Sequence, residues 1–367
     1  MHIEKIELHN FRNYSNLELE FSKNVNLILG KNAQGKTNLL EAVYLTAIGR
    51  SFRTSKDIDL VKFNENNSIV KVWAEKELNS TTVEISIKRK GEKSSEKYIK
   101  KDKKNVTRTS QLLKNILIVI FSPEDLKIVK DEPEKRRKFI DRELSQISPK
   151  YYNSLSNYKK SLLQRNTYLK EENLEPSIID IWDVQLSKYG AEVIFLREKF
   201  IEKLSEYSSK IHSGITGGKE KLDILYEPNV ELKQSLSEQE DFIYSELKNS
   251  FKTDSRNRNT SVGPHRDDIL FVVNDIDMRN FGSQGQQRTC ALSLKLAELN
   301  LIKEKTDEDA ILLLDDVMSE LDADRQEFLI DTMKNNQLFI TTTELDQNIK
   351  DKFKELKIFY IENGNLI

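Results

Sequence analysis

The fold of this chain is decided by the stretch Gly30-Lys31-Asn32-Ala33-Gln34-Gly35-Lys36-Thr37, which fits the pattern G-x-x-x-x-G-K-[ST] at every defined position. Residues 25–29 before it are apolar and predict a buried strand. Residues 38–45 after it carry apolar side chains at helical spacing. A glycine-rich turn between a strand and a helix is the context of a phosphate-binding P-loop, which disfavours the alternative of a chance match in a surface turn.

Each residue type in this stretch suits phosphate binding. Backbone N–H groups of the turn and the N-terminus of the helix attract anions, and glycine lets the chain approach closely. We expect Lys36 to reach the β- and γ-phosphates of ATP and Thr37 to place its hydroxyl on Mg²⁺. The nucleotide-binding residues predicted from this stretch are Gly30, Lys31, Asn32, Ala33, Gln34, Gly35, Lys36, Thr37 and Asn38.

A second strand ends in two carboxylates. The apolar run 310–314 leads into Asp315 and Asp316, as in the Walker B strand of P-loop NTPases. Asp315 is predicted to hold Mg²⁺ with Thr37, directly or through water, and Asp316 to polarise an attacking water. Seen alone, the pair of carboxylates also fits a turn or a helix N-cap. We predict Asp316 and Lys36 as the catalytic residues.

The two motifs lie 285 residues apart, from Gly30 to Asp315, which is much farther than in most compact P-loop NTPases. A split α/β core is therefore predicted, in which residues 1–121 and 305–367 fold together around a mainly α-helical lobe, residues 122–304. Helices are predicted near 123–130, 133–146, 149–171, 177–211, 238–252 and 285–304. Strands are predicted at 2–9, 16–22, 69–75, 82–88, 116–121, 222–232, 269–273, 338–341 and 358–361.

Composition narrows the class of protein. Charged residues make up 32% and hydrophobic residues 37% of the chain, and mean hydropathy is −0.60. The sequence has no apolar run of about 18 residues, no apolar N-terminal signal and a single cysteine, Cys290. We therefore expect a cytoplasmic protein with no membrane partner. The net charge of −2 gives no general attraction to nucleic acid, so any DNA contact must come from a local patch.

One such patch is the basic run from Lys88 to Lys104, which holds nine Lys or Arg against three acidic residues. Its only aromatic residue is Tyr98, so contact with DNA phosphates without base reading is the expected mode. A solvated lysine-rich hairpin is the equal alternative, and the run 135–138 is a weaker candidate. The predicted DNA-binding residues are Lys88, Arg89, Lys90, Lys100, Lys101, Lys103 and Lys104.

A third motif opens the helix predicted at 285–304. Ser283-Gln284-Gly285-Gln286-Gln287-Arg288 resembles the signature sequence of ABC-type ATPases, although a serine N-cap on an ordinary helix is the alternative. The resemblance implies that Ser283 and Gly285 contact the γ-phosphate bound to the P-loop of a second subunit, so that ATP joins a homodimer. Residues 319–322 resemble the D-loop of that superfamily.

Two positions depart from the ABC pattern. Thr343 stands where those ATPases carry a switch histidine, and Asp316 stands where they usually carry glutamate. A shorter acid and no histidine predict a weak ATPase, in which hydrolysis serves as a slow release switch.

Over nearly its whole length, the chain resembles the bacterial RecF family, an SMC-like branch of these ATPases. The phrases that carry the resemblance are Leu8-His9-Asn10-Phe11-Arg12-Asn13-Tyr14, Gly30–Thr37, Gly49-Arg50-Ser51-Phe52-Arg53, Phe121-Ser122-Pro123-Glu124-Asp125-Leu126, Gly263-Pro264-His265-Arg266-Asp267-Asp268 and Ser283–Arg288. The resemblance implies an ATP-dependent dimer that binds single-stranded and duplex DNA at gaps or junctions. It also implies action with the RecO and RecR proteins to load recombinase, with roles at replication forks and in SOS induction, and an Arg12 that approaches the nucleotide phosphates.

Two other classes of protein remain as alternatives. The engine subunit of an ABC transporter is disfavoured by the missing switch histidine and the large insertion. A phosphotransferase would need a Walker B strand close in sequence to the P-loop and an acceptor pocket, and neither is visible in the sequence.

Overall fold

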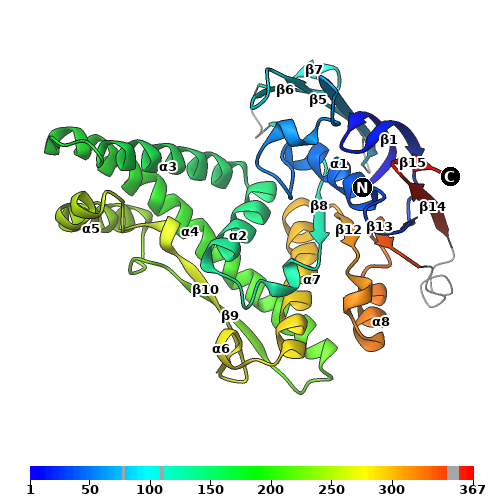
Figure 1. The fold of residues 1–367 in the computed structure, drawn as a ribbon. Helices are drawn as coiled ribbons and strands as arrows, with labels where there is room; N and C mark the ends of the chain where they lie inside the picture. The colour runs from blue at the N-terminus through cyan, green and yellow to red at the C-terminus, as the bar shows by residue number, and fades with distance from the viewer. Residues whose placement is uncertain (77–78, 108–110, 345–354) are drawn as a thin grey trace. The chain divides into compact units, whose positions relative to one another are not determined.

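The computed structural model describes residues 1–76, 79–107, 111–344 and 355–367 (Figure 1). It divides into two compact units, Met1–Asp125 with Glu298–Ile367, and Leu126–Ala297. The first unit therefore combines the two ends of the chain, and the second is mainly helical, as predicted for the fold class. Among the described residues, no helix has the length and apolar character needed to span a bilayer.

A largely parallel sheet of the first unit holds the P-loop strand. Its order is β15-β14-β3-β13-β12-β8, and β3 pairs in parallel with both β13 and β14. The strands are β3 (Val25–Leu29), β8 (Ile118–Phe121), β12 (Ile311–Asp315), β13 (Leu338–Thr342), β14 (Leu356–Glu362) and β15 (Asn365–Leu366). An N-terminal strand thus lies between two C-terminal ones in this sheet.

An antiparallel sheet of the same unit has the order β2-β1-β4-β5-β6-β7. Its strands are β1 (His2–Phe11), β2 (Tyr14–Glu20), β4 (Asn67–Glu75), β5 (Ser80–Arg89), β6 (Ser95–Lys101) and β7 (Lys104–Asn105). Helix α1 (Lys36–Ile48) contacts strands of both sheets and is buried at every position from Leu39 to Ala47. A helix that is apolar on all sides needs such a place inside the core.

The second unit is built on long helices. They are α2 (Pro133–Ile147), α3 (Pro149–Tyr168), α4 (Pro176–Ile215), α5 (Leu236–Asn257), the short α6 (Met278–Phe281) and the first part of α7 (Gln284–Thr306). Helices α3 and α5 each pack along α4 (Figure 1). A small antiparallel sheet is formed by β9 (Leu222–Glu227), β10 (Asp268–Val273) and β11 (Ile276–Asp277). The remaining helix, α8 (Ala323–Thr332), belongs to the first unit.

The helix predicted at 123–130 is wrong. This segment forms turns and one short 3-10 helix, Asp125–Lys127. The carboxylate of Asp125 accepts hydrogen bonds from the backbone N–H and the hydroxyl of Ser122, both at 2.8 Å. Such side-chain bonds stabilise a turn in competition with a helix, and Pro133 then starts α2.

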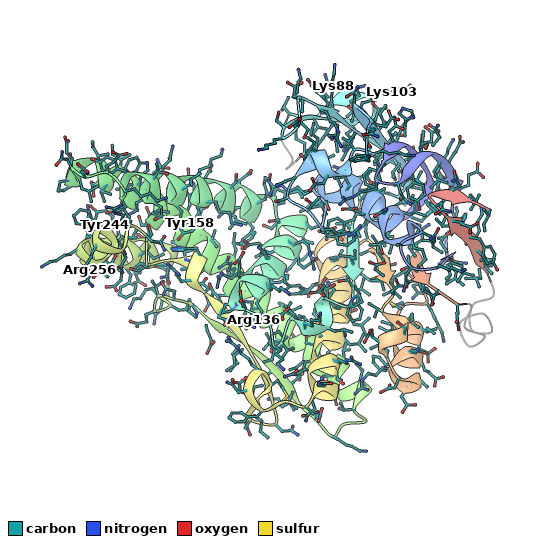
Figure 2. All side chains as sticks on the ribbon, in the orientation of Figure 1. Lys88, Lys103, Arg136, Tyr158, Tyr244 and Arg256 are labelled. Atoms are coloured by element: carbon teal, nitrogen blue, oxygen red, sulfur yellow. The ribbon has the colours of Figure 1, made fainter. Side chains whose placement is uncertain are left out.

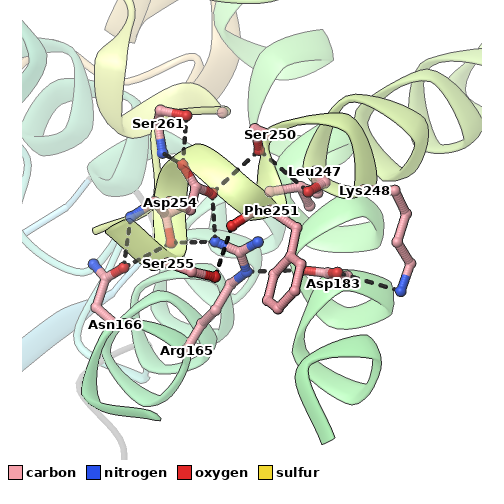
Figure 3. Close-up of polar contacts among 12 residues, drawn as sticks. Arg165, Asn166, Asp183, Leu247, Lys248, Ser250, Phe251, Asp254, Ser255 and Ser261 are labelled. Atoms are coloured by element: carbon pink, nitrogen blue, oxygen red, sulfur yellow. Dashed lines mark hydrogen bonds and ion pairs between the residues drawn. The ribbon is translucent and has the colours of Figure 1, made fainter. Parts of the chain in front are cut away.

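Three buried charges connect the helices of the second unit (Figure 3). Arg165 on α3 donates to Asp183 of α4 and to Asp254 of α5, both at 2.7 Å, and all three side chains are 0% exposed. Arg165 also donates to the Thr260 hydroxyl at 2.9 Å, and Asp254 accepts from the backbone N–H of Ser261 at 3.0 Å. A buried charge is tolerated only with such partners, so the network ties the loop at 260–261 to three helices.

Candidate functional site

The P-loop and the Walker B carboxylate lie at one edge of the parallel sheet. Strands β3, β13 and β12 are parallel neighbours, with Asp315 opposite Thr341 and Thr341 opposite Ile28. Parallel strands deliver their carboxyl ends to the same edge, which is where open α/β sheets bind ligands. The P-loop and the Walker B strand are 285 residues apart in sequence, yet they reach the same edge of one sheet.

The Lys36 side chain folds back over the loop. Its Nζ donates to the backbone carbonyls of Gly30 at 2.8 Å and Lys31 at 3.4 Å, and the side chain is only 4% exposed. The same Nζ lies 4.0 Å from Oδ2 of Asp316. The loop thus holds a positive charge over the turn that was predicted to bind phosphate.

Thr37 and Asp315 are brought together as a pair of oxygen ligands. The Thr37 hydroxyl donates to Oδ1 of Asp315 at 2.8 Å, and the Thr341 hydroxyl donates to the same oxygen at 2.9 Å. Burial raises the pKa of Asp315, while the bonds from Thr37 and Thr341 oppose that rise. A hydroxyl beside a carboxylate is the donor set that Mg²⁺ takes next to nucleotide phosphates, so the residues present fit this ion.

Asp316 leaves the strand in an unusual conformation. Its φ is 53°, in the left-handed region, and its backbone N–H donates to the Thr341 hydroxyl at 2.9 Å. The side chain is 37% exposed beside Lys36. The turn therefore presents this carboxylate to solvent, where a water molecule has access.

The P-loop is supported by two segments that sequence reasoning did not assign to the site. Asn13 Nδ2 donates to the Gln34 carbonyl at 2.8 Å, and the buried Tyr14 hydroxyl donates to the Gly35 carbonyl at 2.9 Å. From the C-terminal hairpin, the N–H of Gly364 donates to the same Gln34 carbonyl at 3.0 Å. The sequence holds one signal for Asn13 and Tyr14, because both belong to the segment Leu8–Tyr14 that carries part of the family resemblance.

Both glycines of the motif are required by close approach. A Cβ at Gly30 would lie 2.3 Å from the Ile361 carbonyl oxygen. Gly35 has a φ of 122°, and a Cβ there would lie 2.7 Å from Asn13 Nδ2. Any other residue at either position would displace the supporting segments.

Arg12 is paired inside the protein. Its Nε and Nη2 donate to the two oxygens of Glu41, at 2.8 and 2.7 Å, and Nη1 donates to the Asp59 carbonyl at 2.8 Å. The Glu41 side chain is 0% exposed and also accepts from Arg53 at 3.4 Å. Sequence reasoning missed Glu41, because a carboxylate inside an apolar helix gives no sign of its partner. Arg12 therefore lies next to α1, where the Glu41 carboxylate balances most of its positive charge.

A polar cavity of about 570 Å³ opens beside the start of α1. Asn38, the residue after Thr37, lies in its wall and accepts from Arg53 at 2.7 Å. Phe63, with 82% of its surface exposed, lies at the same cavity. The other cationic residues of the wall are Arg12 and Arg89. The cavity continues the P-loop site on the side of the antiparallel sheet.

The signature motif is a capped helix N-terminus in the second unit. The backbone N–H of Gln286 donates to Ser283 Oγ at 3.2 Å, and the N–H of Ser283 donates to Gln286 Oε1 at 3.1 Å. Ser283 and Gly285 are both exposed. The N-cap alternative is therefore realised, and it leaves the Ser283 hydroxyl proton available to an anion at the end of α7.

The motif 263–268 is internal bracing. The Asp267 carboxylate accepts from Arg197 at 2.8 Å and from the backbone N–H of Asn229 at 2.9 Å. Asp268 forms a bidentate pair with Arg136 at 2.6 and 2.8 Å. Arg136 is thereby buried, which removes the central member of the weaker basic candidate at 135–138.

His265 belongs to the same bracing. Its Nε2 contacts the Thr260 carbonyl at 3.0 Å, and its Nδ1 contacts the Tyr158 hydroxyl at 2.6 Å. A carbonyl only accepts, so Nε2 carries the proton and the tyrosine donates to Nδ1. Burial lowers the pKa of His265 to about 4. The ring is therefore neutral at pH 7.

Acidification is expected to destabilise the protein through His265. In the unfolded chain its imidazole binds a proton near pH 6.5, but in the folded chain only near pH 4, so stability falls across that window. At about 1.4 kcal/mol per pH unit, the loss of stability reaches at most about 3.5 kcal/mol. Urea unfolding from pH 7.5 to 4.5 measures it. His265→Gln keeps a donor and an acceptor without titrating and should flatten the upper part of the curve, whereas parallel curves would contradict this assignment.

The basic residues on β5–β7 divide into two groups. Lys90 pairs with Glu96 at 3.3 Å, Lys100 pairs with Glu84 at 3.1 Å, and Arg89 lies at the polar cavity. Within the described residues, no ion pair is recorded for Lys88, Lys101, Lys103 or Lys104. In the strand register, Lys88 (labelled in Figure 2) pairs with Glu96 at the start of β6, whereas the turn that holds Lys103 follows the other end of β6, beside Thr82. The basic side chains without a recorded ion pair therefore lie in two places, at Lys88 near one end of the β5–β6 pair and around residues 101–104 at the other.

Known proteins resemble the chain over its full length. The family model of the RecF/RecN/SMC N terminal domain matches residues 2–366. A Clostridium tetani protein named DNA replication and repair protein RecF is 44% identical over 370 residues, with both chains covered completely. A solved structure of the recombination mediator protein RecF-ATPrS in the RecFOR pathway is 38% identical, with a TM-score of 0.92, covering 100% of this chain and 97% of the other. An SmcHead structure, 16% identical with a TM-score of 0.57 and covering 100% of this chain and 98% of its own, supports the fold alone.

Proposed function

This chain belongs to the RecF branch of the RecF/RecN/SMC family, and from that premise we propose that it is an ATP-dependent DNA-binding protein of replication and repair. The observation that carries the proposal is the meeting of Lys36, Thr37 and Asp315 at one sheet edge. The related structure named for RecF-ATPrS supports ATP as the nucleotide.

In the proposed site, Lys36 binds the β- and γ-phosphates and the N–H groups of residues 30–38 surround them. Thr37 and Asp315 hold Mg²⁺, which supplies charge neutralisation on the phosphate oxygens when bound. Asp316 orients the attacking water. The polar cavity with Phe63 and Arg53 is the place for the ribose and the base. Hydrolysis is slow, since the acid is an aspartate and Thr343 provides no imidazole.

The proposed active form is a homodimer. Ser283 and Gly285 of one copy meet the γ-phosphate held by the other, so the capped end of α7 completes the site. ATP then joins the two copies, and hydrolysis releases them. We retain residues 122–304 as the proposed second domain that carries this helix end. The transporter alternative is not favoured, because the relatives found are named for DNA replication and repair.

The proposed DNA is single-stranded DNA and gapped duplex, bound in the cytoplasm by lysines of β5–β7. RecO and RecR are the proposed partners, because the related structure is named as a mediator of the RecFOR pathway. Loading of recombinase at stalled forks and SOS induction follow from that role. RecF proteins with these partners would act where duplex and single strand meet.

DNA affinity is expected to rise with ATP and to fall steeply with salt. Replacing Lys88, Lys103 and Lys104 together with glutamine should lower the slope of log affinity against log salt by up to about 3, because each phosphate that a lysine neutralises adds about 0.9 to the slope. Fluorescence anisotropy of a gapped duplex measures it between roughly 50 and 300 mM salt, a range over which phosphate contacts are progressively screened.

A matched control removes three charges elsewhere in the same unit. Lys23, Lys334 and Lys357 are exposed and lie outside β5–β7. Their replacement with glutamine should leave the slope within experimental error of the parent. Salt-insensitive binding by the parent would contradict phosphate contact, and equal slopes for both triple variants would remove β5–β7 as the contact surface.

A further inference from the structure

We propose that Glu220 and His212 are positioning residues for the signature motif, which fix the N-terminus of α7 before a second copy of the chain arrives. The proposal rests on the proposed function, in which this helix end completes the nucleotide site of the other copy. Neither residue touches nucleotide in the proposed dimer. Both act through Gln286.

A closed chain of polar contacts carries the inference. Gln286 Nε2 donates to Glu220 Oε1 at 2.8 Å, and Glu220 Oε2 lies 3.1 Å from His212 Nε2. On the other side of the ring, His212 Nδ1 lies 3.1 Å from Ser293 Oγ. Ser293 belongs to α7, as Gln286 does. The contacts therefore leave α7 near its first turn, pass through the turn after α4 and the end of α4, and return to α7 two turns later.

Burial strengthens the hydrogen bonds that link Gln286, Glu220, His212 and Ser293. His212 and Ser293 are 0% exposed, and the Glu220 side chain is 22% exposed. Because a carboxylate accepts, His212 Nε2 carries the proton and donates to Glu220. Hydrogen bonds to a charged group that is shielded from water are stronger than surface ones. The Glu220 carboxylate is thus held on one oxygen by histidine while the other holds Gln286.

Gln286 connects Glu220 to Ser283 through two further hydrogen bonds. Its amide oxygen accepts from the N–H of Ser283, and its backbone N–H donates to the Ser283 hydroxyl oxygen. Its amide nitrogen is the only remaining polar group of the side chain, and Glu220 binds it. Glu220 therefore selects the Gln286 rotamer that caps the helix. Without Glu220, that rotamer competes with others and the cap is populated for less of the time.

Hydrogen exchange on the nucleotide-free protein tests this arrangement directly. We expect Glu220→Ala to speed exchange in residues 283–288 by about tenfold or more, the equivalent of losing one hydrogen bond to a charged group. Glu220→Gln retains an oxygen for Gln286 and should restore most of the protection. The matched control is Glu202→Ala, which removes an exposed carboxylate from α4 and should leave residues 283–288 unchanged.

Dimerisation gives the second readout. Since a symmetric dimer contains two signature contacts, we expect Glu220→Ala to weaken ATP-dependent dimerisation by about tenfold or more, with ATP affinity of the monomer unchanged. Because Glu220 acts through Gln286, adding Gln286→Ala to Glu220→Ala should bring little further loss. Additive losses would overturn the proposal.

The outcomes separate this proposal from the proposed function. Unchanged exchange at 283–288 in Glu220→Ala overturns the positioning role even if the parent protein dimerises with ATP. If Glu220→Ala exchanges faster but the parent protein stays monomeric with ATP, the proposed homodimer is contradicted. Glu220 then has no dimer contact for which to position the helix. If Glu220→Ala lowers the thermal unfolding midpoint of the whole unit, its faster exchange has a second cause, and the Glu220→Gln variant decides between them. Protection of residues 283–288 in Glu220→Gln that is no better than in Glu220→Ala also overturns the proposal.

Discussion

Replacing Lys36 with alanine should lower the affinity for ATP by at least about 100-fold, since two charge-assisted hydrogen bonds to phosphate at about 1.5 to 3 kcal/mol each are removed. The side chain is almost completely buried, and its Nζ already stands over the turn, so little ordering is required when phosphate arrives. Titration with a fluorescent ATP analogue and Mg²⁺ measures the loss.

Lys31→Ala is the matched control. It removes the same charge from the same loop, but the side chain of Lys31 is exposed and its contribution to the loop is a backbone carbonyl. We expect a change of less than about fivefold, the size of a solvent-screened contact. ATP affinity of Lys36→Ala equal to that of the parent would rule out the P-loop as the binding site.

The second large effect concerns Ser283. Addition of ATP to an Asp316→Asn variant should convert the monomer to a dimer, and Ser283→Arg in that background should keep it monomeric. An arginine at the end of α7 fills the space of the proposed γ-phosphate contact and puts a cation at a helix N-terminus, where the dipole disfavours it. Light scattering with ATP measures the mass of each variant.

The control for this experiment is Ser213→Arg. Ser213 is an exposed serine near the end of α4, in the same unit as Ser283. This variant should dimerise as the parent does, and ATP binding by the monomer should survive in both serine variants because the P-loop lies in the other unit. A Ser283→Arg protein that dimerises with parental affinity would exclude the signature contact.

Patterns among neighbouring residues predicted those parts of the site that lie within a single segment of the sequence. The strand and helix that flank residues 30–37 follow from hydrophobic periodicity, and Asp315 follows from an apolar run that ends in carboxylates. The support of the P-loop by Asn13 and Gly364 was beyond reach, because it depends on hydrogen bonds between segments 21 and 330 residues apart in sequence. Strand order is a tertiary property that no periodicity encodes.

Charges were the least predictable feature. Arg136 belongs to the run 135–138 that was a candidate basic patch, yet it is buried on a carboxylate, and Arg165 is buried on two. The partners come from other helices, so sequence neighbours give no signal. His212 is fully buried with a polar contact at each ring nitrogen, and no local pattern in the sequence indicates these partners. Helix periodicity tells which face is apolar, but a buried ion pair interrupts that pattern without changing the helix.

Helix α4 has a mechanical consequence. Its 40 residues correspond to about 60 Å of helix, with Asp183 of the buried charge network near its first turns and His212 in its last. The helix is fastened at both ends, to α3 and α5 through Arg165 and to α7 through Glu220. Helix α4 therefore connects the buried charge network to the hydrogen bonds around the N-terminus of α7. By geometry, a rigid tilt of α4 by about 5° about its His212 end would move the other end by about 5 Å over this length, so the contacts with Arg165 and Glu220 together restrict the direction of this helix.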